Sequence, residues 1–243
     1  KQVRKAFIAE KDTSILLAAD YSQIDLRALA HLSQDPKLVS AFLQGEDIHS
    51  TTASQVYVVP LSEVSKAMRR LAKTVNFGVI YGMSEYGLEQ ATELSREESA
   101  QFIASYFERY PRVKEYLDET KKQAYQSGYV QTILGRRRYI PEINSTNAQV
   151  RMAAERMAIN MPVQGTSADI IKVAMIQLQH EMDKLGLETK MILQVHDELL
   201  FELPREEEEK MKELVLRIMP NAIKLSVPVK VDIKTGRSWG DME

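Results

Sequence analysis

Two aspartates that follow apolar segments have the clearest potential for chemistry in this sequence. Asp20 ends the apolar run 15–19, and Asp197 lies in a polar tip between the apolar segments 191–194 and 199–203. Ionised carboxylates at the ends of buried strands are costly unless a cation or a hydrogen-bond donor satisfies them. Divalent cations with oxygen ligands meet this need. We therefore expect Asp20 and Asp197 to share a divalent-metal site if their strands lie side by side, although an aspartate after a strand also commonly serves as a turn residue or helix cap.

A second candidate site follows from a spacing of four residues. Arg69, Lys73, Phe77 and Tyr81 recur along the helical segment 62–81, which we expect to be the longest helix. This spacing keeps all four on one broad face of a helix. The two cations suit a triphosphate and the two aromatic rings suit a base. A solvated Arg/Lys edge beside a buried aromatic stripe gives the same pattern, so this segment alone leaves both interpretations open.

The elements that must position these residues follow from hydrophobic periodicity and from turn and cap residues. Helical periodicity covers 23–42, with a break at Asp35–Pro36, and a further helix begins at 47–49. The other expected helices are 62–81, 95–107, 111–125, 147–160, 168–185 and 205–219. We expect Pro162 to Gly165 to separate the helix 147–160 from the helix 168–185. Residues 95–98 should form a capping box. Strands are expected over 5–19, 191–194, 199–203 and 227–233, and a hairpin with one basic strand over 128–141.

Composition narrows the class of protein. The chain has 243 residues, no cysteine and four histidines, which excludes disulfides and argues against zinc sites, so any metal should have oxygen ligands. No apolar run is long enough for a membrane span, and the N-terminal residues do not resemble a signal peptide, so we expect a cytoplasmic protein. The net charge is −2, but residues 128–156 hold five arginines and two glutamates. That basic segment fits phosphate binding, although a solvated surface is the commoner explanation of a single charge run.

Three motifs together resemble motifs A, B and C of the family A DNA polymerases, the bacterial DNA polymerase I group. They are DYSQIDLR at 20–27, RRLAKTVNFGVIYG at 69–82 and QVHDEL at 194–199. They occur in the family's order, and the segments GRRRYIP at 135–141 and NMPVQG at 160–165 resemble the family as well. The resemblance covers essentially the whole chain as far as Trp239.

The resemblance implies an α+β fold, with an antiparallel palm sheet backed by helices and a helical fingers insertion. Residues 1–59 would form the first part of the palm, 60–111 the fingers insertion, and 112–243 the remainder of the fingers and the second part of the palm. We do not expect the segments of this chain to include the thumb or the exonuclease-like domain of the family. We therefore expect the C-terminal half of a larger polymerase, whose missing N-terminal part would be a partner together with primer–template DNA and deoxynucleoside triphosphates.

The resemblance also implies a role for each matching residue. Asp20, Asp197 and the backbone carbonyl of Tyr21 would bind two Mg²⁺ ions, for which Mn²⁺ is a possible substitute, with Glu198 as an acidic neighbour. Arg69 and Lys73 would hold the triphosphate, Lys73 being also catalytic. The other matching positions surround the nucleotide or the primer–template junction: His49, Phe77, Tyr81 and Asp25 for the nucleotide, and Gln23, Arg156, Asn160, Gln164 and His196 for the DNA.

The implied function is template-directed DNA synthesis in replication and repair, by transfer of a nucleotide to a primer 3′-hydroxyl through two-metal catalysis. One alternative is a fragment that binds primer–template or nucleotide without turnover, because the thumb is missing. Another is a metal-dependent nuclease, which would use the paired aspartates but leaves the face that begins at Arg69 unexplained. The chain departs from the family at Asp25, where the motif usually has Glu. Since Asp is one methylene shorter, we expect weaker rejection of ribonucleotides.

Overall fold

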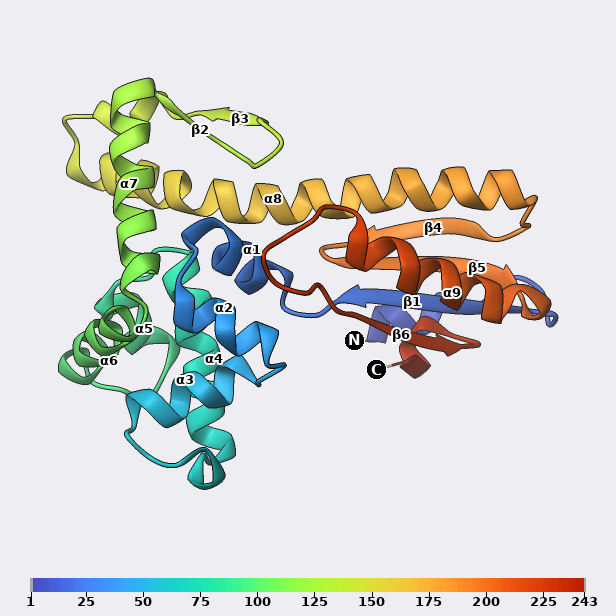
Figure 1. The fold of residues 1–243 in the computed structure, drawn as a ribbon, viewed down its shortest axis with the longest axis horizontal. Helices are drawn as coiled ribbons and strands as arrows, with labels where there is room; N and C mark the ends of the chain where they lie inside the picture. The colour runs from blue at the N-terminus through green and yellow to red at the C-terminus, as the bar shows by residue number, and fades with distance from the viewer. Residues whose placement is uncertain (1, 243) are drawn as a thin grey trace. The chain divides into compact units, whose positions relative to one another are not determined.

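The computed structural model describes residues 2–242, which fall into two compact units (Figure 1). The first unit contains the chain up to Ile24, Ser167–Lys224 and the segment from Val229 onward. The second contains Asp25–Thr166 and Leu225–Pro228. These boundaries differ from the expected palm and fingers segments, which divide the chain by function, so that functional division stays a prediction.

An antiparallel sheet forms the centre of the first unit. Its strand order is β4-β5-β1-β6, with bounds β1 Ser14–Tyr21, β4 Lys190–Val195, β5 Glu198–Pro204 and β6 Val231–Gly236. Strand β1 is buried at every position except Asp20, because it pairs on both edges and is covered on both faces. The predicted α+β fold with an antiparallel sheet is therefore confirmed.

Two helices accompany this sheet within the first unit. They are α9 (Glu208–Ile218) and the C-terminal half of α8 (Ala148–Leu185), joined by an ion pair of 3.0 Å between Arg217 and Glu181. The buried Tyr21 hydroxyl donates a hydrogen bond of 2.8 Å to the carbonyl of Met219, just after α9. Trp239 and Met242 pack on the sheet with Ala18. This packing holds the end of β1 in place from several directions.

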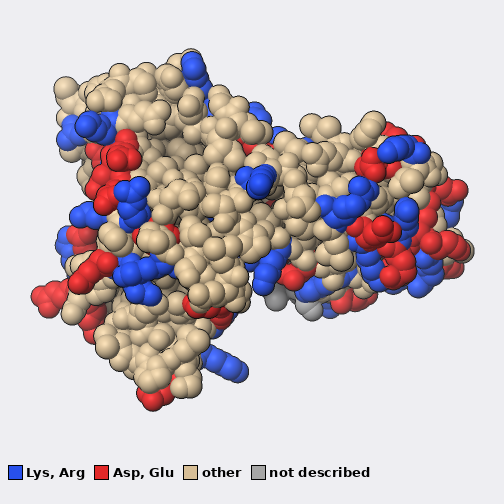
Figure 2. All heavy atoms as spheres, in the orientation of Figure 1, with Lys and Arg blue, Asp and Glu red and all other residues tan. Residues whose placement is uncertain are grey.

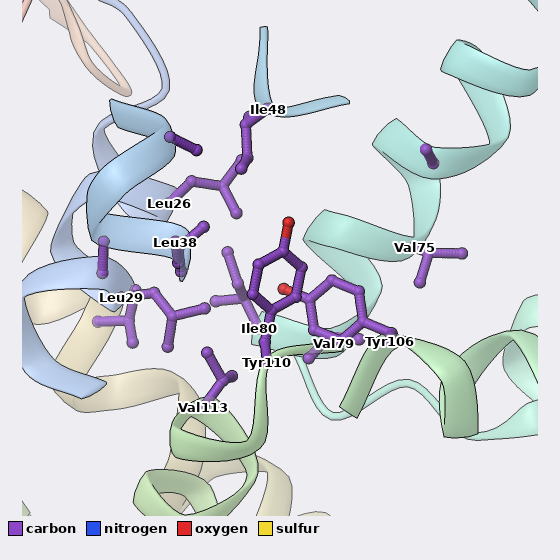
Figure 3. Close-up of a cluster of buried hydrophobic side chains, with 14 of the residues drawn as sticks. Leu26, Leu29, Leu38, Ile48, Val75, Val79, Ile80, Tyr106, Tyr110 and Val113 are labelled. Atoms are coloured by element: carbon purple, nitrogen blue, oxygen red, sulfur yellow. The ribbon is translucent and has the colours of Figure 1, made fainter. Parts of the chain in front are cut away.

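The second unit is mainly helical and has its own apolar core. Its elements are α1 Ile24–Ser33, α2 Pro36–Leu43, α3 Ile48–Val56, α4 Lys66–Ile80, α5 Glu85–Ala91, α6 Arg96–Arg109, α7 Pro111–Ser127, the hairpin strands β2 Tyr129–Gln131 and β3 Arg137–Tyr139, and the N-terminal half of α8. Figure 3 shows side chains from α1, α2, α3, α4, α6 and α7 in the cluster around Tyr110, which follows α6. The side chains of Asp35, Asp47 and Ser65 cap the helices that follow them, and the predicted capping box at Ser95 is confirmed.

The expected interruption between two later helices is wrong. Helix α8 runs for 38 residues from Ala148 to Leu185 with Pro162 inside it, and it is longer than the 15 residues of α4, which we had expected to be the longest helix. Proline removes one backbone hydrogen bond and disfavours the helix interior. The flanking Ile159 and Val163 are buried, however, and their burial offsets that cost. Sequence propensity is a weak indicator where tertiary packing opposes it.

Other expected boundaries need smaller corrections. Residues 2–6 form a 3₁₀ helix, and β1 begins at Ser14 rather than near residue 5. The last strand begins at Val231, four residues after the expected start. Strand β4 was expected to be buried but lies at the sheet edge, where its residues alternate between exposed and partly exposed. Among residues 2–242, no helix combines the length and the apolar character that crossing a bilayer requires.

Candidate active site

Strand pairing in the first unit brings the carboxylates of three segments together. Asp20 near the end of β1 lies opposite Glu198 of β5 on one side and opposite Asp232 of β6 on the other. Opposite residues in antiparallel strands project to the same face, so the three side chains are neighbours. Asp197 lies in the turn that precedes β5, and its carbonyl accepts a hydrogen bond of 3.2 Å from the Tyr21 amide. The two predicted aspartates therefore lie in adjacent segments.

The electrostatics of this cluster are unfavourable when no cation is bound. Burial, together with repulsion from Asp197, Glu198 and Asp232, raises the pKa of Asp20 to about 6, although part of the side chain reaches solvent. Asp20, Glu198 and Asp232 are among the residues that line a pocket of about 410 Å³. A divalent cation in this place would relieve the repulsion between the carboxylates.

Glu198 is already engaged by other groups. Its Oε1 accepts a hydrogen bond of 2.6 Å from the Trp239 indole, and its Oε2 lies 3.3 Å from the Arg4 guanidinium, which also stacks over the Trp239 ring. The Glu198 charge is thus partly neutralised by the protein. Asp232 had no expected role. The alternation of residues along β6 is the signal that could have identified it, because its register puts Asp232 on the face of Asp20.

The carboxylates fit a metal that takes only part of its ligands from the protein. Within residues 2–242, no group of three or more His, Asp and Glu side chains is arranged as a complete metal site. Mg²⁺ commonly binds through one or two carboxylates and takes its other ligands from water and substrate phosphates. Asp20 and Asp197, with the Tyr21 carbonyl, match that requirement.

In the second unit, helix α4 presents the expected aromatic face. The rings of Phe77 and Tyr81 are roughly parallel with centroids 6.4 Å apart, and the His49 ring lies 5.8 Å from that of Phe77. The Tyr81 hydroxyl donates a hydrogen bond of 3.0 Å to the carboxylate of Asp25. Four residues expected to surround a nucleotide therefore lie together, and both Phe77 and Tyr81 remain partly exposed.

The cationic end of the same helix is also ordered. The Arg69 guanidinium forms two hydrogen bonds with the Asp47 carboxylate, of 2.6 Å and 3.3 Å, and Lys73 is exposed one turn later. Asp47 is exposed; partial desolvation raises the pKa of its carboxyl, but hydrogen bonds from Arg69 and Ser50 outweigh this effect and lower the pKa. Asp47 also caps α3 through the amide of His49. Arg69 thus has a carboxylate partner within the second unit.

His49 lies inside the second unit rather than on its surface. Its side chain is 2% exposed, and its Nδ1 lies 3.0 Å from the amide nitrogen of Asn76. Because that nitrogen can only donate, Nδ1 must accept, so the ring is neutral. Burial lowers the pKa of His49 to about 4, with the nearby Arg69 and Lys73 cations acting in the same direction.

The expected DNA-facing residues are divided between the units. Arg156, Asn160 and Gln164 are spaced by four along α8 in the second unit, Arg156 and Gln164 being exposed. The Asn160 Oδ1 is buried and has no hydrogen-bond partner within residues 2–242. In the first unit, Gln23 and His196 both adopt positive φ, of 56° and 54°. Such strain in a residue other than glycine is common at functional sites.

Close backbone approach explains two glycines on this side of the second unit. A Cβ on Gly82 would lie 2.6 Å from Ile159 and 3.1 Å from Arg156, so the end of α4 packs directly on α8. A Cβ on Gly165 would lie 2.5 Å from the methyl group of Thr132. Both glycines belong to segments that resemble the family motifs.

The basic segment has internal partners as well as exposed charge. The Arg137 guanidinium stacks over the Tyr129 ring at 4.5 Å, and Arg151 donates a hydrogen bond of 2.9 Å to the carbonyl of Ser145. In the first unit, Figure 2 shows Lys and Arg side chains mixed with Asp and Glu over α9. That face of the first unit is therefore not a uniform basic surface of the kind that binds DNA through charge alone.

Comparisons with known proteins agree with this arrangement. The family model for DNA polymerase family A matches residues 1–241. DNA polymerase I of Caldicellulosiruptor bescii is 52% identical over 239 residues, which are 98% of this chain and 28% of that protein. DNA polymerase I of Bacillus caldotenax is 48% identical over 241 residues, 99% of this chain and 28% of that protein.

The solved structures include a close relative. The POL domain of Pol1 from M. smegmatis, in complex with DNA primer-template and dNTP, matches with a TM-score of 0.94 and 47% identity, over 98% of this chain and 42% of that chain. Both the sequence and the three-dimensional arrangement are thus similar to those of polymerases. The chain belongs to DNA polymerase family A.

Proposed function

We propose that this chain carries the nucleotide-transfer site of a larger DNA polymerase, which extends a primer 3′-hydroxyl on a DNA template from deoxynucleoside triphosphates. The observation that carries the proposal is the pairing of β1 with both β5 and β6, which collects Asp20, Asp197 and neighbouring carboxylates at one place. The chain spans 28% of the curated relatives it matches, so the remaining parts of the enzyme would come from outside this sequence.

Each group of residues would have its own task. Asp20, Asp197 and the Tyr21 carbonyl would hold Mg²⁺ or Mn²⁺, which when bound lowers the pKa of the primer hydroxyl and neutralises charge on the phosphates. Arg69 and Lys73 would orient the triphosphate by charge-assisted hydrogen bonds. Most of the acceleration in phosphoryl transfer comes from such positioning and charge neutralisation.

The aromatic and amide side chains would serve the bases and the DNA. Phe77 would stack on the incoming nucleotide and Tyr81, held by Asp25, would lie beside the new base pair. The positions on α8 and in the turns after β1 and β4 would line the primer–template junction. The buried Asn160 Oδ1 supports this assignment, because a buried acceptor is costly until a donor reaches it.

The test is Asp197→Asn in the full-length protein, a change that keeps size and removes charge. We expect primer extension with Mg²⁺ to fall by orders of magnitude while the Kd for primer–template stays nearly constant. Asp118→Asn makes the same chemical change on the exposed surface of α7 and should extend normally. Near-normal extension by Asp197→Asn would exclude the proposed site. DNA binding without any extension by the unaltered protein would favour a non-catalytic binding role.

A further inference from the structure

The backbone just after β1 is held from both sides. On the hairpin side, the Tyr21 amide donates to the Asp197 carbonyl at 3.2 Å. On the other side, the Ser22 amide donates to the Lys230 carbonyl at 2.9 Å, and the Ser22 hydroxyl donates to Asp232 Oδ2 at 2.6 Å. The segment that carries the Tyr21 carbonyl is therefore clamped between the Asp197 turn and the start of β6.

Asp232 occupies a position where a carboxylate is electrostatically unfavourable. It lies directly opposite Asp20 in the β1–β6 register, with Asp197 and Glu198 nearby and Lys234 as a cation on its own strand. Like charges opposite each other in a sheet destabilise the pairing. Against this repulsion, the Asp232 carboxylate accepts a hydrogen bond from the Ser22 hydroxyl. This bond gives the position a purpose that a neutral apolar residue could not meet.

We propose that Asp232 is a positioning residue for the metal site. Its hydrogen bond with Ser22 fixes the backbone at Tyr21 and Ser22, so that the Asp20 carboxylate and the Tyr21 carbonyl are presented to the same divalent ion. The inference rests on the proposed function, in which Asp20, Tyr21 and Asp197 are the ligands. Groups that orient metal ligands through hydrogen bonds typically contribute 10–100-fold to metal affinity.

Three variants of the full-length protein separate the hydrogen bond from the charge. Ser22→Ala removes the donor and keeps the carboxylate, Asp232→Ala removes both acceptor and charge, and Asp232→Asn removes the charge but keeps an amide oxygen that can accept from Ser22. We expect the first two to weaken Mn²⁺ binding, measured by electron paramagnetic resonance without nucleotide, by about 10–100-fold. Asp232→Asn should bind Mn²⁺ nearly as tightly as the unaltered protein, because it keeps the acceptor for Ser22.

The Mg²⁺ concentration for half-maximal primer extension should shift in parallel with the Mn²⁺ affinity. The Tm should change little, because Asp232 is exposed and Ser22 is partly exposed. A variant that lacks both the Asp20 and the Asp197 carboxylates gives the background of the binding measurement, and the Mn²⁺ that it still binds is subtracted. Loss of metal binding in Asp232→Asn with normal binding in Ser22→Ala would overturn the proposal, because charge alone would then matter. Unchanged binding in all three variants would also overturn it.

The same series distinguishes this inference from the proposed function. If Asp197→Asn extends primers normally, the proposed function fails whatever the Asp232 variants do. If Asp197→Asn abolishes extension while Ser22→Ala and Asp232→Ala bind metal normally, the positioning role alone fails.

Discussion

The buried histidine of the second unit leads to a quantitative prediction about pH. His49 is 2% exposed and accepts a hydrogen bond from Asn76 at Nδ1, so the folded state resists protonation, and its pKa lies at about 4. In the unfolded chain the imidazole has its ordinary pKa of about 6.5. Between these values the unfolded state binds more protons than the folded state. The stability contributed by neutral His49 is therefore complete above pH 6.5 and is lost as the pH falls toward 4.

The size of the effect follows from those two values. A pH of 5 is about 1.5 units below the pKa of the unfolded imidazole, which is then protonated, whereas the folded imidazole is still mostly neutral. At about 1.4 kcal/mol per pH unit, moving from pH 7 to pH 5 should cost the second unit about 2 kcal/mol through His49 alone. His31, whose pKa is also lowered by burial, acts in the same direction, so a variant is needed to isolate His49.

The variant is His49→Asn, because the asparagine Oδ1 occupies nearly the place of Nδ1 and can still accept from Asn76, but it cannot be protonated. Its stability at pH 7 should fall because the ring leaves a cavity. The pH dependence is the informative quantity. Amide hydrogen exchange of the full-length protein, corrected for intrinsic rates, gives the free energy of opening at α3 and α4. Between pH 7 and pH 5, this free energy should fall by about 2 kcal/mol less in the variant than in the unaltered protein.

Equal pH dependence in the two proteins would refute this reasoning. An NMR resonance of histidine that titrates near pH 6.5 in the unaltered protein and is absent from the variant would also refute it. Either result would mean that His49 reaches solvent in the folded state and can bring a positive charge to a phosphate at neutral pH.

Three further predictions concern the proposed nucleotide site at α4 and its neighbours Asp25 and Asp47. Asp25→Glu should raise the ratio of kcat/KM for deoxynucleotides over ribonucleotides by about 10–200-fold, because the added methylene fills space near the sugar, and an unchanged ratio would exclude this position as the gate. Asp47→Asn should lower the KM for deoxynucleotides about 1.5- to 5-fold, because the exposed ion pair that competes for Arg69 contributes only about 0.2–1 kcal/mol. A raised KM would mean instead that Asp47 orients Arg69. Lys73→Ala should reduce kcat/KM for nucleotides at least about 10-fold with an unchanged primer–template Kd, and the reverse pattern would assign α4 to the duplex.

The sequence alone indicated the candidate site residues and where most helices and strands lie. The expectation that Asp20 and Asp197 share a site required their strands to lie side by side, and the observed sheet pairs β1 with β5, which follows the Asp197 turn. Local rules sufficed for the helix caps and for the four-residue spacing from Arg69 to Tyr81, because both depend on neighbours in the sequence. The capping box at Ser95 and the break before Pro36 followed from the same short-range chemistry.

Tertiary structure decided what depends on contacts between distant segments. Helix α8 continues through Pro162 because buried neighbours offset the lost hydrogen bond, and propensity could not reveal that burial. The pairing of Asp47 with Arg69 and of Asp232 with Ser22 joins residues far apart in the chain, so no local pattern indicates either. The Asp20 pKa of about 6 arises from burial and from carboxylates on other strands. Electrostatic shifts of this kind depend on distances that only the folded chain sets.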